Sequence, residues 1–341
     1  KALSLRESVL GPEHPDTLTS MNNLAGLYKS QGRYGEAEPL LRKALSLCES
    51  VLGPEHPSTL KVRRNYAVCL TNLKNYDQAL FQLKKAEAAS LARTGNLLKT
   101  TLKQRVRGQH LFSASTLQNI ALTLAIQYSP EGSEAFAADV LLRWKEIQAE
   151  EDAYVAHLIQ TTNDPEVRAL GGDVMDLRSS LTRLPFQEGG DDQRPKLLAR
   201  LESLELKLAE KSREYKGALQ VFNAGMDRVR YALPPKTALI EFRHFKPVDF
   251  KTGDLGDPHW AAALVYSEGT GDGLVFEDLG PVDATRELWT KLRSAESNAE
   301  AKDLSKALYQ NLFATFDDKL KDFHTLYIAP DGFLHQVAFS R

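Results

Sequence analysis

A segment of the chain returns almost unchanged 42 residues later. Residues 1–18, KALSLRESVLGPEHPDTL, reappear as residues 43–60, KALSLCESVLGPEHPSTL, with two differences. A repeat of this length is one supersecondary unit, which cannot bury its apolar face alone and has to stack on its neighbours. The first part of the chain is therefore predicted to be a solenoid, and this restricts the fold more than any other feature.

Apolar residues within each repeat fall at helical spacing. Ala25 and Tyr28 share one helical face, whereas Ala37 and Leu41 share another, and Gly32 breaks the pattern between them. Small residues let two helices cross closely, and larger ones fill the space between. Each repeat is therefore predicted to be a pair of packed helices.

This pattern resembles the tetratricopeptide repeat, in the 42-residue form found in kinesin light chains. The alternation of small and large residues is the signature of that family, and the linker LGPEHPDTL at residues 10–18 is typical of the long form. The resemblance implies an α-helical solenoid over residues 1–92. It also implies a groove that binds a protein or peptide partner.

Polar residues on the first helix of each repeat are candidates for contacting a partner, because they could hydrogen-bond an extended backbone. These candidates are Asn22, Asn23, Lys29, Asn65 and Tyr66. An ordinary solvated helix surface explains each of them equally well. The second repeat departs from the first where Arg63 replaces Met21, as expected of a repeat that meets a different neighbour.

Residues 93–232 are predicted to form a helical connector, in which the helical pattern runs from Ala114 to about Tyr215. Apolar residues step by three and four over residues 167–184 and 197–208, with a Gly-Gly-Asp-Asp loop at 189–192 between them. This pattern predicts an antiparallel helical hairpin with a leucine seam. The basic run over 99–110 lacks interleaved aromatic residues, so a solvated helix face explains it better than a nucleic-acid contact.

The pattern changes from helix to strand after Pro234-Pro235. Strands are predicted over 238–242, 262–266, 274–276 and 325–329, and helices over 282–296 and 301–320. Strands that alternate with helices indicate an α/β layer, in which the strand at 325–329 would need neighbours on both sides. Pro330-Asp331-Gly332 is predicted to be a tight turn, because Pro fixes φ, Asp accepts a backbone hydrogen bond and Gly permits a positive φ.

This order of elements resembles the N-terminal part of a CHAT domain, a caspase-like peptidase domain often found behind tetratricopeptide repeats. The resemblance is carried by ALIEF at 238–242, AAALVYS at 261–267 and LYIAPDGFLHQVAF at 326–339. The residues of the family motif are Pro330, Asp331, Gly332 and His335. The expected fold is thus a helical repeat region (1–92), a helical connector (93–232) and an incomplete α/β caspase-like domain (233–341).

The resemblance implies a His–Cys pair further along the chain, in which a thiolate attacks the amide carbon and an imidazole moves the proton. Cys48 and Cys69 lie in the repeats, and no His-Gly pair occurs, so no catalytic residue carries over. His335 is expected to be structural. One interpretation is the regulatory and pro-catalytic portion of a cysteine endopeptidase in bacterial proteolytic signalling or immunity, inactive by itself. The other is a non-catalytic scaffold with a degenerate docking domain.

Composition limits the remaining function classes. Lys and Arg number 43 against 45 Asp and Glu, so the net charge of −2 excludes a globally basic nucleic-acid binder. The longest apolar run, residues 260–266, is far shorter than the ~20 residues of a membrane span. No metal or cofactor site is predicted. The expected location is the cytoplasm.

The two ends of the sequence look like the interior of a longer protein. The chain opens inside a repeat, and Arg341 follows an apolar segment at 337–339. The catalytic half of the same CHAT domain is therefore an expected partner, together with a protein or peptide at the repeats. Arg341 is a candidate processing site, and simple truncation there explains the end equally well.

Overall fold

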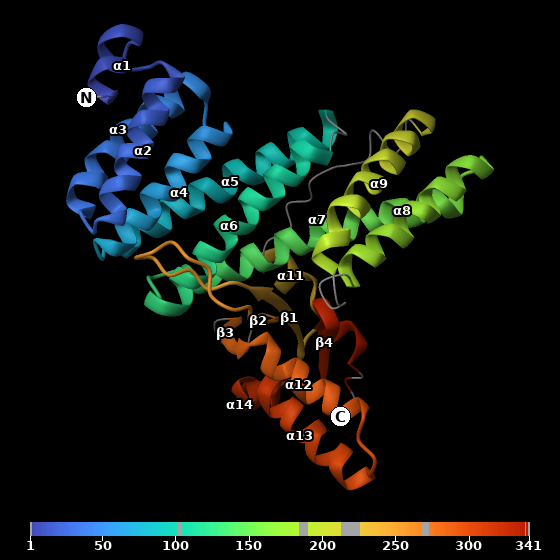
Figure 1. The fold of residues 1–341 in the computed structure, drawn as a ribbon. Coiled ribbons are helices and arrows are strands. Elements are labelled where there is room, and N and C mark those ends of the chain that lie inside the picture. Colours follow the sequence, from blue (N-terminus) through green and yellow to red (C-terminus); the bar gives the residue numbers. More distant parts are fainter. Residues whose placement is uncertain are drawn as a thin grey trace. The chain divides into compact units, whose positions relative to one another are not determined.

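In the computed structural model the chain forms two compact units. Figure 1 shows the helices and strands in chain order, from blue to red. The structure describes residues 2–100, 104–183, 190–212, 226–267, 273–337 and 339. The first unit, here called the repeat unit, comprises Lys1–Asn96, Gly108–Phe136 and Pro247–Gly256. The second, here called the sheet unit, comprises Leu97–Arg107, Ala137–Lys246 and Asp257–Arg341.

The repeat unit is built from consecutive antiparallel helices. They are α1 (Ala2–Leu10), α2 (Pro15–Ser30), α3 (Tyr34–Leu52), α4 (Pro57–Asn72) and the greater parts of α5 (Tyr76–Thr100) and α6 (Gln104–Tyr128). Ala25 and Ala37, the small residues predicted at the helix crossings, are fully buried, and so is Ala67, which lies 42 residues after Ala25. The prediction of stacked helical pairs is therefore confirmed.

Histidines start the first helix of each repeat. The Nδ1 atoms of His14 and His56 accept hydrogen bonds of 3.2 Å from the backbone N–H groups of Asp16 and Ser58. A proline follows each histidine at the first helical position, where its missing N–H costs nothing. The sequence GPEHP, which is identical in the two linkers, is thus a helix-start signal that occurs twice.

Four further helices lie between α6 and the sheet in the described part of the chain. They are α7 (Ser133–Thr161), α8 (Pro165–Arg183), α9 (Gly190–Lys211) and α11 (Met226–Ala232). Val174 and Leu177 of α8 pack against Leu201 and Leu208 of α9, so the predicted hairpin with a leucine seam is confirmed. The predicted loop at 189–192 is wrong from Gly190 onward, because α9 already begins there.

The sheet is mixed and has four strands in the described residues. They are β1 (Thr237–Phe245), β2 (His259–Tyr266), β3 (Leu274–Pro281) and β4 (Thr325–Ala329), in the order β3-β2-β1-β4. The pairs β1–β2 and β2–β3 are antiparallel, whereas β1 and β4 are parallel. The strand predicted at 274–276 is longer than expected, because β3 continues to Pro281.

Helices cover one face of the sheet. They are α12 (Val282–Arg293), α13 (Asn298–Phe313) and α14 (Asp317–Leu320), with 3₁₀ turns at η2 (Ala314–Phe316) and η3 (Gly332–Gln336). Ile240, Phe242 and Leu264 of the sheet share a buried core with Leu312 and Phe316. The single helix predicted over 301–320 is therefore wrong: the chain turns at η2, where Phe316 enters the core.

Candidate functional site

Two of the five candidate groove residues contact each other. Nδ2 of Asn65 on α4 donates a 2.9 Å hydrogen bond to Oδ1 of Asn22 on α2. Asn22 is buried, whereas Asn23 beside it is exposed. This amide pair joins the first helices of two successive repeats.

Tyr66 is held inside the repeats by a carboxylate. Its hydroxyl donates a 2.9 Å hydrogen bond to Oε1 of Glu38 on α3. Burial, with this bond and the charge of Glu38, raises the pKa of Tyr66 to about 12. Tyr66 is therefore neutral, and its hydroxyl already has a partner.

Lys29 and Arg64 form a recessed cationic pair on the same two helices. Both side chains are partly buried, and burial lowers the pKa of each. The charge of Arg64 lowers the pKa of Lys29 further. Neither has a carboxylate within ion-pair distance among the residues that the structure describes. Sequence reasoning found Lys29 but missed Arg64, because periodicity alone does not distinguish it from the buried Arg63.

The thiols of the repeats are unreactive. Cys48 and Cys69 are free and buried, and burial raises the pKa of Cys69 to about 11 and that of Cys48 also. A thiolate is the nucleophilic form of cysteine, so neither residue supplies a nucleophile near neutral pH.

The predicted turn motif is tied to the end of β1. Asp331 accepts hydrogen bonds from the backbone N–H groups of Gly332 at 2.8 Å and His244 at 3.2 Å. Its Oδ2 also lies 2.9 Å from Nδ1 of His244. Gly332 has the predicted positive φ, of 53°, and Asp331 caps η3 as its side chain was expected to do, but Asp331 itself is extended and the turn runs from Asp331 to Leu334. Exposed His335 lies within η3, whereas Arg341 lies outside the described residues.

The pKa of Asp331 reflects two opposing effects. Burial alone would raise it, but the hydrogen bonds and charge of His244, with the charge of Arg243, hold it well below the ordinary value. The carboxylate is therefore ionised across the physiological range. His244 was missed by sequence reasoning, since its partner lies 87 residues further along the chain.

A second histidine and aspartate meet at the same end of the sheet. Nδ1 of His259 on β2 lies 2.9 Å from Oδ2 of Asp278 on β3. The strand register places His244 opposite Trp260, next to His259. A carboxylate that orients an imidazole is one half of a proton-transfer system, which needs a nucleophile to complete it.

We expect Asp331→Asn to lower the free energy of unfolding by about 1–3 kcal/mol at pH 7, because three donors lose a charged acceptor. The folded-state pKa of Asp331 is depressed, so this stability is present above the unfolded value near ~4 and is lost as the pH falls below it. Denaturant unfolding at pH 7 and in acid measures the effect. The two proteins should converge in acid, and Asp322→Asn, at an exposed position, should change nothing at either pH.

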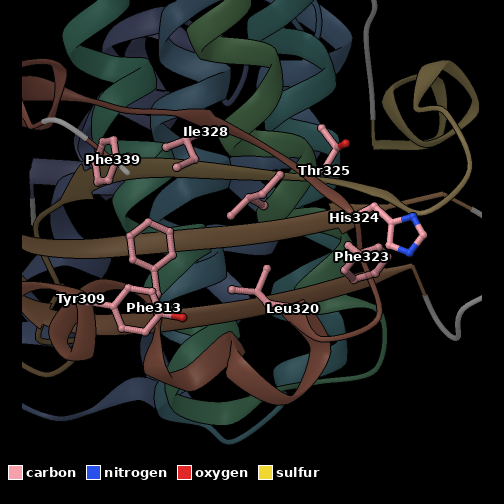
Figure 2. Close-up of a pocket in the computed structure, with 9 residues that line it drawn as sticks. Tyr309, Phe313, Leu320, Phe323, His324, Thr325, Ile328 and Phe339 are labelled. Atoms are coloured by element: carbon pink, nitrogen blue, oxygen red, sulfur yellow. The ribbon is translucent and has the colours of Figure 1, made fainter. Parts of the chain in front are cut away.

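An apolar pocket of about 210 Å³ lies between α13, α14 and β4 (Figure 2). Its lining comprises Tyr309, Phe313, Leu320, Phe323, His324, Thr325, Leu326, Ile328 and Phe339. Sites for small molecules are usually larger, about 300–1,000 Å³, so this pocket has room for one apolar side chain. No sequence signal identified it, because its walls come from three separate elements.

Neither a metal cluster nor a membrane helix is found in the described ranges. No group of three or more His, Cys, Asp or Glu side chains there could hold a metal ion. Likewise, none of the helices described is long and apolar enough to cross a bilayer.

Comparison with known protein families identifies repeats in two parts of the chain. Residues 1–50 and 21–92 match one model of the tetratricopeptide repeat, and residues 113–147 match another. The second match lies in the part assigned above to the connector, where α6 and α7 follow each other. No curated protein matches the chain. Residues 1–92 and 113–147 are thus tetratricopeptide repeats, which indicate a role in protein interaction.

Proposed function

We propose that the repeats bind an acidic segment of a partner protein across α2 and α4. The observation that carries this proposal is the recessed pair Lys29 and Arg64, which lacks a carboxylate partner among the described residues. Cations that are partly removed from water and unpaired are costly to a folded protein. An acidic side chain placed between them recovers that cost as binding energy.

Neighbouring polar groups suit the backbone of such a segment. The exposed amide of Asn23 and the partly buried amide of Asn65 lie on the same two helices as the cations. The first helices of stacked repeats together form the concave surface that solenoids use for binding. Charge would then select the partner, and the amides would position it.

The double variant Lys29→Gln/Arg64→Gln tests this site. A fluorescein-labelled peptide of six glutamates is the probe, with a six-serine peptide as reference. We expect the acidic peptide to bind the unaltered chain, and the double variant to weaken binding by about tenfold or more. Lys61→Gln, at an exposed position on α4, is the matched control. Equal binding of the two peptides, or an equal loss with the control, would contradict the proposal.

We further propose that residues 233–341 are the N-terminal portion of a CHAT-like, caspase-like domain whose catalytic half follows residue 341. The parallel pair β1 and β4 supports this, because functional groups of α/β sheets gather at the carboxyl ends of such strands. His244 and Asp331 lie at those ends. The edge position of β4 and the apolar pocket beside it suit further packing.

In this proposal the chain is the regulatory and pro-catalytic part of a cytoplasmic cysteine endopeptidase in bacterial proteolytic signalling or immunity. Purified residues 1–341 should then cleave no peptide, whereas a form extended by the missing half should cleave, and a Cys→Ala change in that half should abolish cleavage. An extended form that binds partners but never cleaves would favour a non-catalytic scaffold with a CHAT-like docking domain instead.

A further inference from the structure

The segment Pro247–Gly256, here called the strap, joins two strands of the sheet but packs with the repeats. It connects β1, which ends at Phe245, to β2, which begins at His259. Nevertheless it belongs to the repeat unit, and the chain passes from one unit to the other immediately before and after it. A simple hairpin connection would need only a few residues, so the length of the strap is used for something else.

The strap is anchored on α4 and α6 by its backbone. Nδ2 of Asn72, at the end of α4, donates a 2.6 Å hydrogen bond to the carbonyl oxygen of Phe250. The backbone N–H of Val248 donates a 3.1 Å bond to Oγ1 of Thr123 on α6. Tyr34 on α3 adds a longer bond of 3.4 Å, from its hydroxyl to the carbonyl oxygen of Lys251.

Two apolar side chains of the strap are removed from water. Val248 and Phe250 are each only 5% exposed. The ring of Phe250 lies 5.9 Å from that of Tyr128, which stacks on Tyr76 at 4.4 Å. A buried aromatic ring in a small pocket is the usual anchor of a protein interface.

The strap has its own internal structure, and this makes it a preformed ligand. Val248 pairs with Leu255, and Oδ1 of Asp249 accepts the backbone N–H groups of Lys251 at 2.7 Å and Thr252 at 3.2 Å. Gly253 adopts a φ of 83°, which favours glycine. A turn fixed in this way loses little conformational freedom when it binds.

We propose that the strap is a tethered ligand of the repeats, which docks and undocks as one piece. A change in the repeats that alters this docking thereby changes the order of the backbone at the ends of β1 and β2. The three side-chain anchors and the two apolar residues of the strap make a small interface. The covalent tether keeps it occupied, because it raises the local concentration of the strap near the repeats. Helix α4 carries both Asn72, which holds the strap, and Arg64, at the proposed binding site. Undocking releases the chain next to His244 and His259.

Hydrogen exchange on the intact chain tests this proposal without any partner, so its outcome is independent of the acidic-segment site. In the unaltered chain, the strap amides of Val248, Gly253 and Gly256 should exchange together and faster than the paired amides at the middle of β1 and β2. Phe250→Ala should speed strap exchange by about tenfold or more. It should also speed exchange at the His244–Trp260 end of the ladder but not at the Ala238–Tyr266 end.

Two further variants keep the test decisive. Leu255→Ala removes an exposed apolar side chain from the same strap and should leave all these rates unchanged. Asn72→Ala removes one anchor without creating a large cavity, and replaces Phe250→Ala if that variant fails to fold. If the strap amides exchange only together with the whole β1–β2 ladder, the strap does not undock by itself and the proposal fails. If Phe250→Ala speeds exchange in the strap alone, undocking does not affect the ends of β1 and β2, and that part of the proposal is wrong.

Discussion

Glu205→Ala is expected to lower the free energy of unfolding by about 3–5 kcal/mol. Oε1 of Glu205 on α9 lies 2.8 Å from Nη2 of Arg178 on α8, and the two side chains are 3% and 10% exposed. Removal of the carboxylate takes away the negative charge that lies 2.8 Å from this buried guanidinium. Thermal and denaturant unfolding measure the loss.

An exposed ion pair on the same two helices provides the control. Nζ of Lys211 lies 2.7 Å from Oε2 of Glu166, and both side chains are about half exposed. Glu166→Ala should lower the free energy of unfolding by less than about 1 kcal/mol, because water screens the two charges and solvates them when the pair is broken. The double change Arg178→Met/Glu205→Leu should recover most of the loss, since apolar residues of similar size can replace a buried pair. Equal effects at Glu166 and Glu205 would contradict this account.

Trp260→Ala should destabilise the sheet unit by about 3–5 kcal/mol, through loss of packing and the cavity left behind. Trp260 is 1% exposed and meets the ring of Phe333 edge-on at 5.7 Å and that of His244 at 6.1 Å. It thus supports both η3 and the histidine that binds Asp331. Unfolding curves, with hydrogen exchange of η3, measure the effect.

Trp289→Ala is the matched control, because this tryptophan on α12 is only partly buried at the same core. It should cost less than Trp260→Ala and leave the pairing of His244 with Asp331 intact. If Trp289→Ala lowers the free energy of unfolding more than Trp260→Ala does, the prediction is wrong and the core is centred on the helices rather than on β2.

Local patterns predicted the helical pairs, the leucine seam and the Pro-Asp-Gly turn, because each depends on residues close together in sequence. The strap could not be predicted in this way. Its anchors Asn72 and Thr123 lie 178 and 125 residues from their partners, and the sequence of the strap reads as an ordinary polar loop.

The degree of burial of individual side chains also could not be predicted from the repeat pattern. Arg63 stood out only as a departure from Met21, yet it is buried and bonded to Gln82 at 2.8 Å and to Glu49. Its neighbour Arg64 is recessed without a countercharge among the described residues. Adjacent arginines look alike in a sequence, and only the packing of the helices separates a structural cation from a candidate binding one.

The position of the strap limits where this array can grow. Near-identical copies such as residues 1–18 and 43–60 favour in-frame gain or loss of whole repeats, and a solenoid tolerates this because each repeat contacts only its neighbours. An added repeat ahead of α2 leaves Tyr34, Asn72 and Thr123 together. One inserted between α4 and α6 would separate Asn72 from Thr123. Repeat number is therefore free to vary ahead of α2 and fixed between α4 and α6.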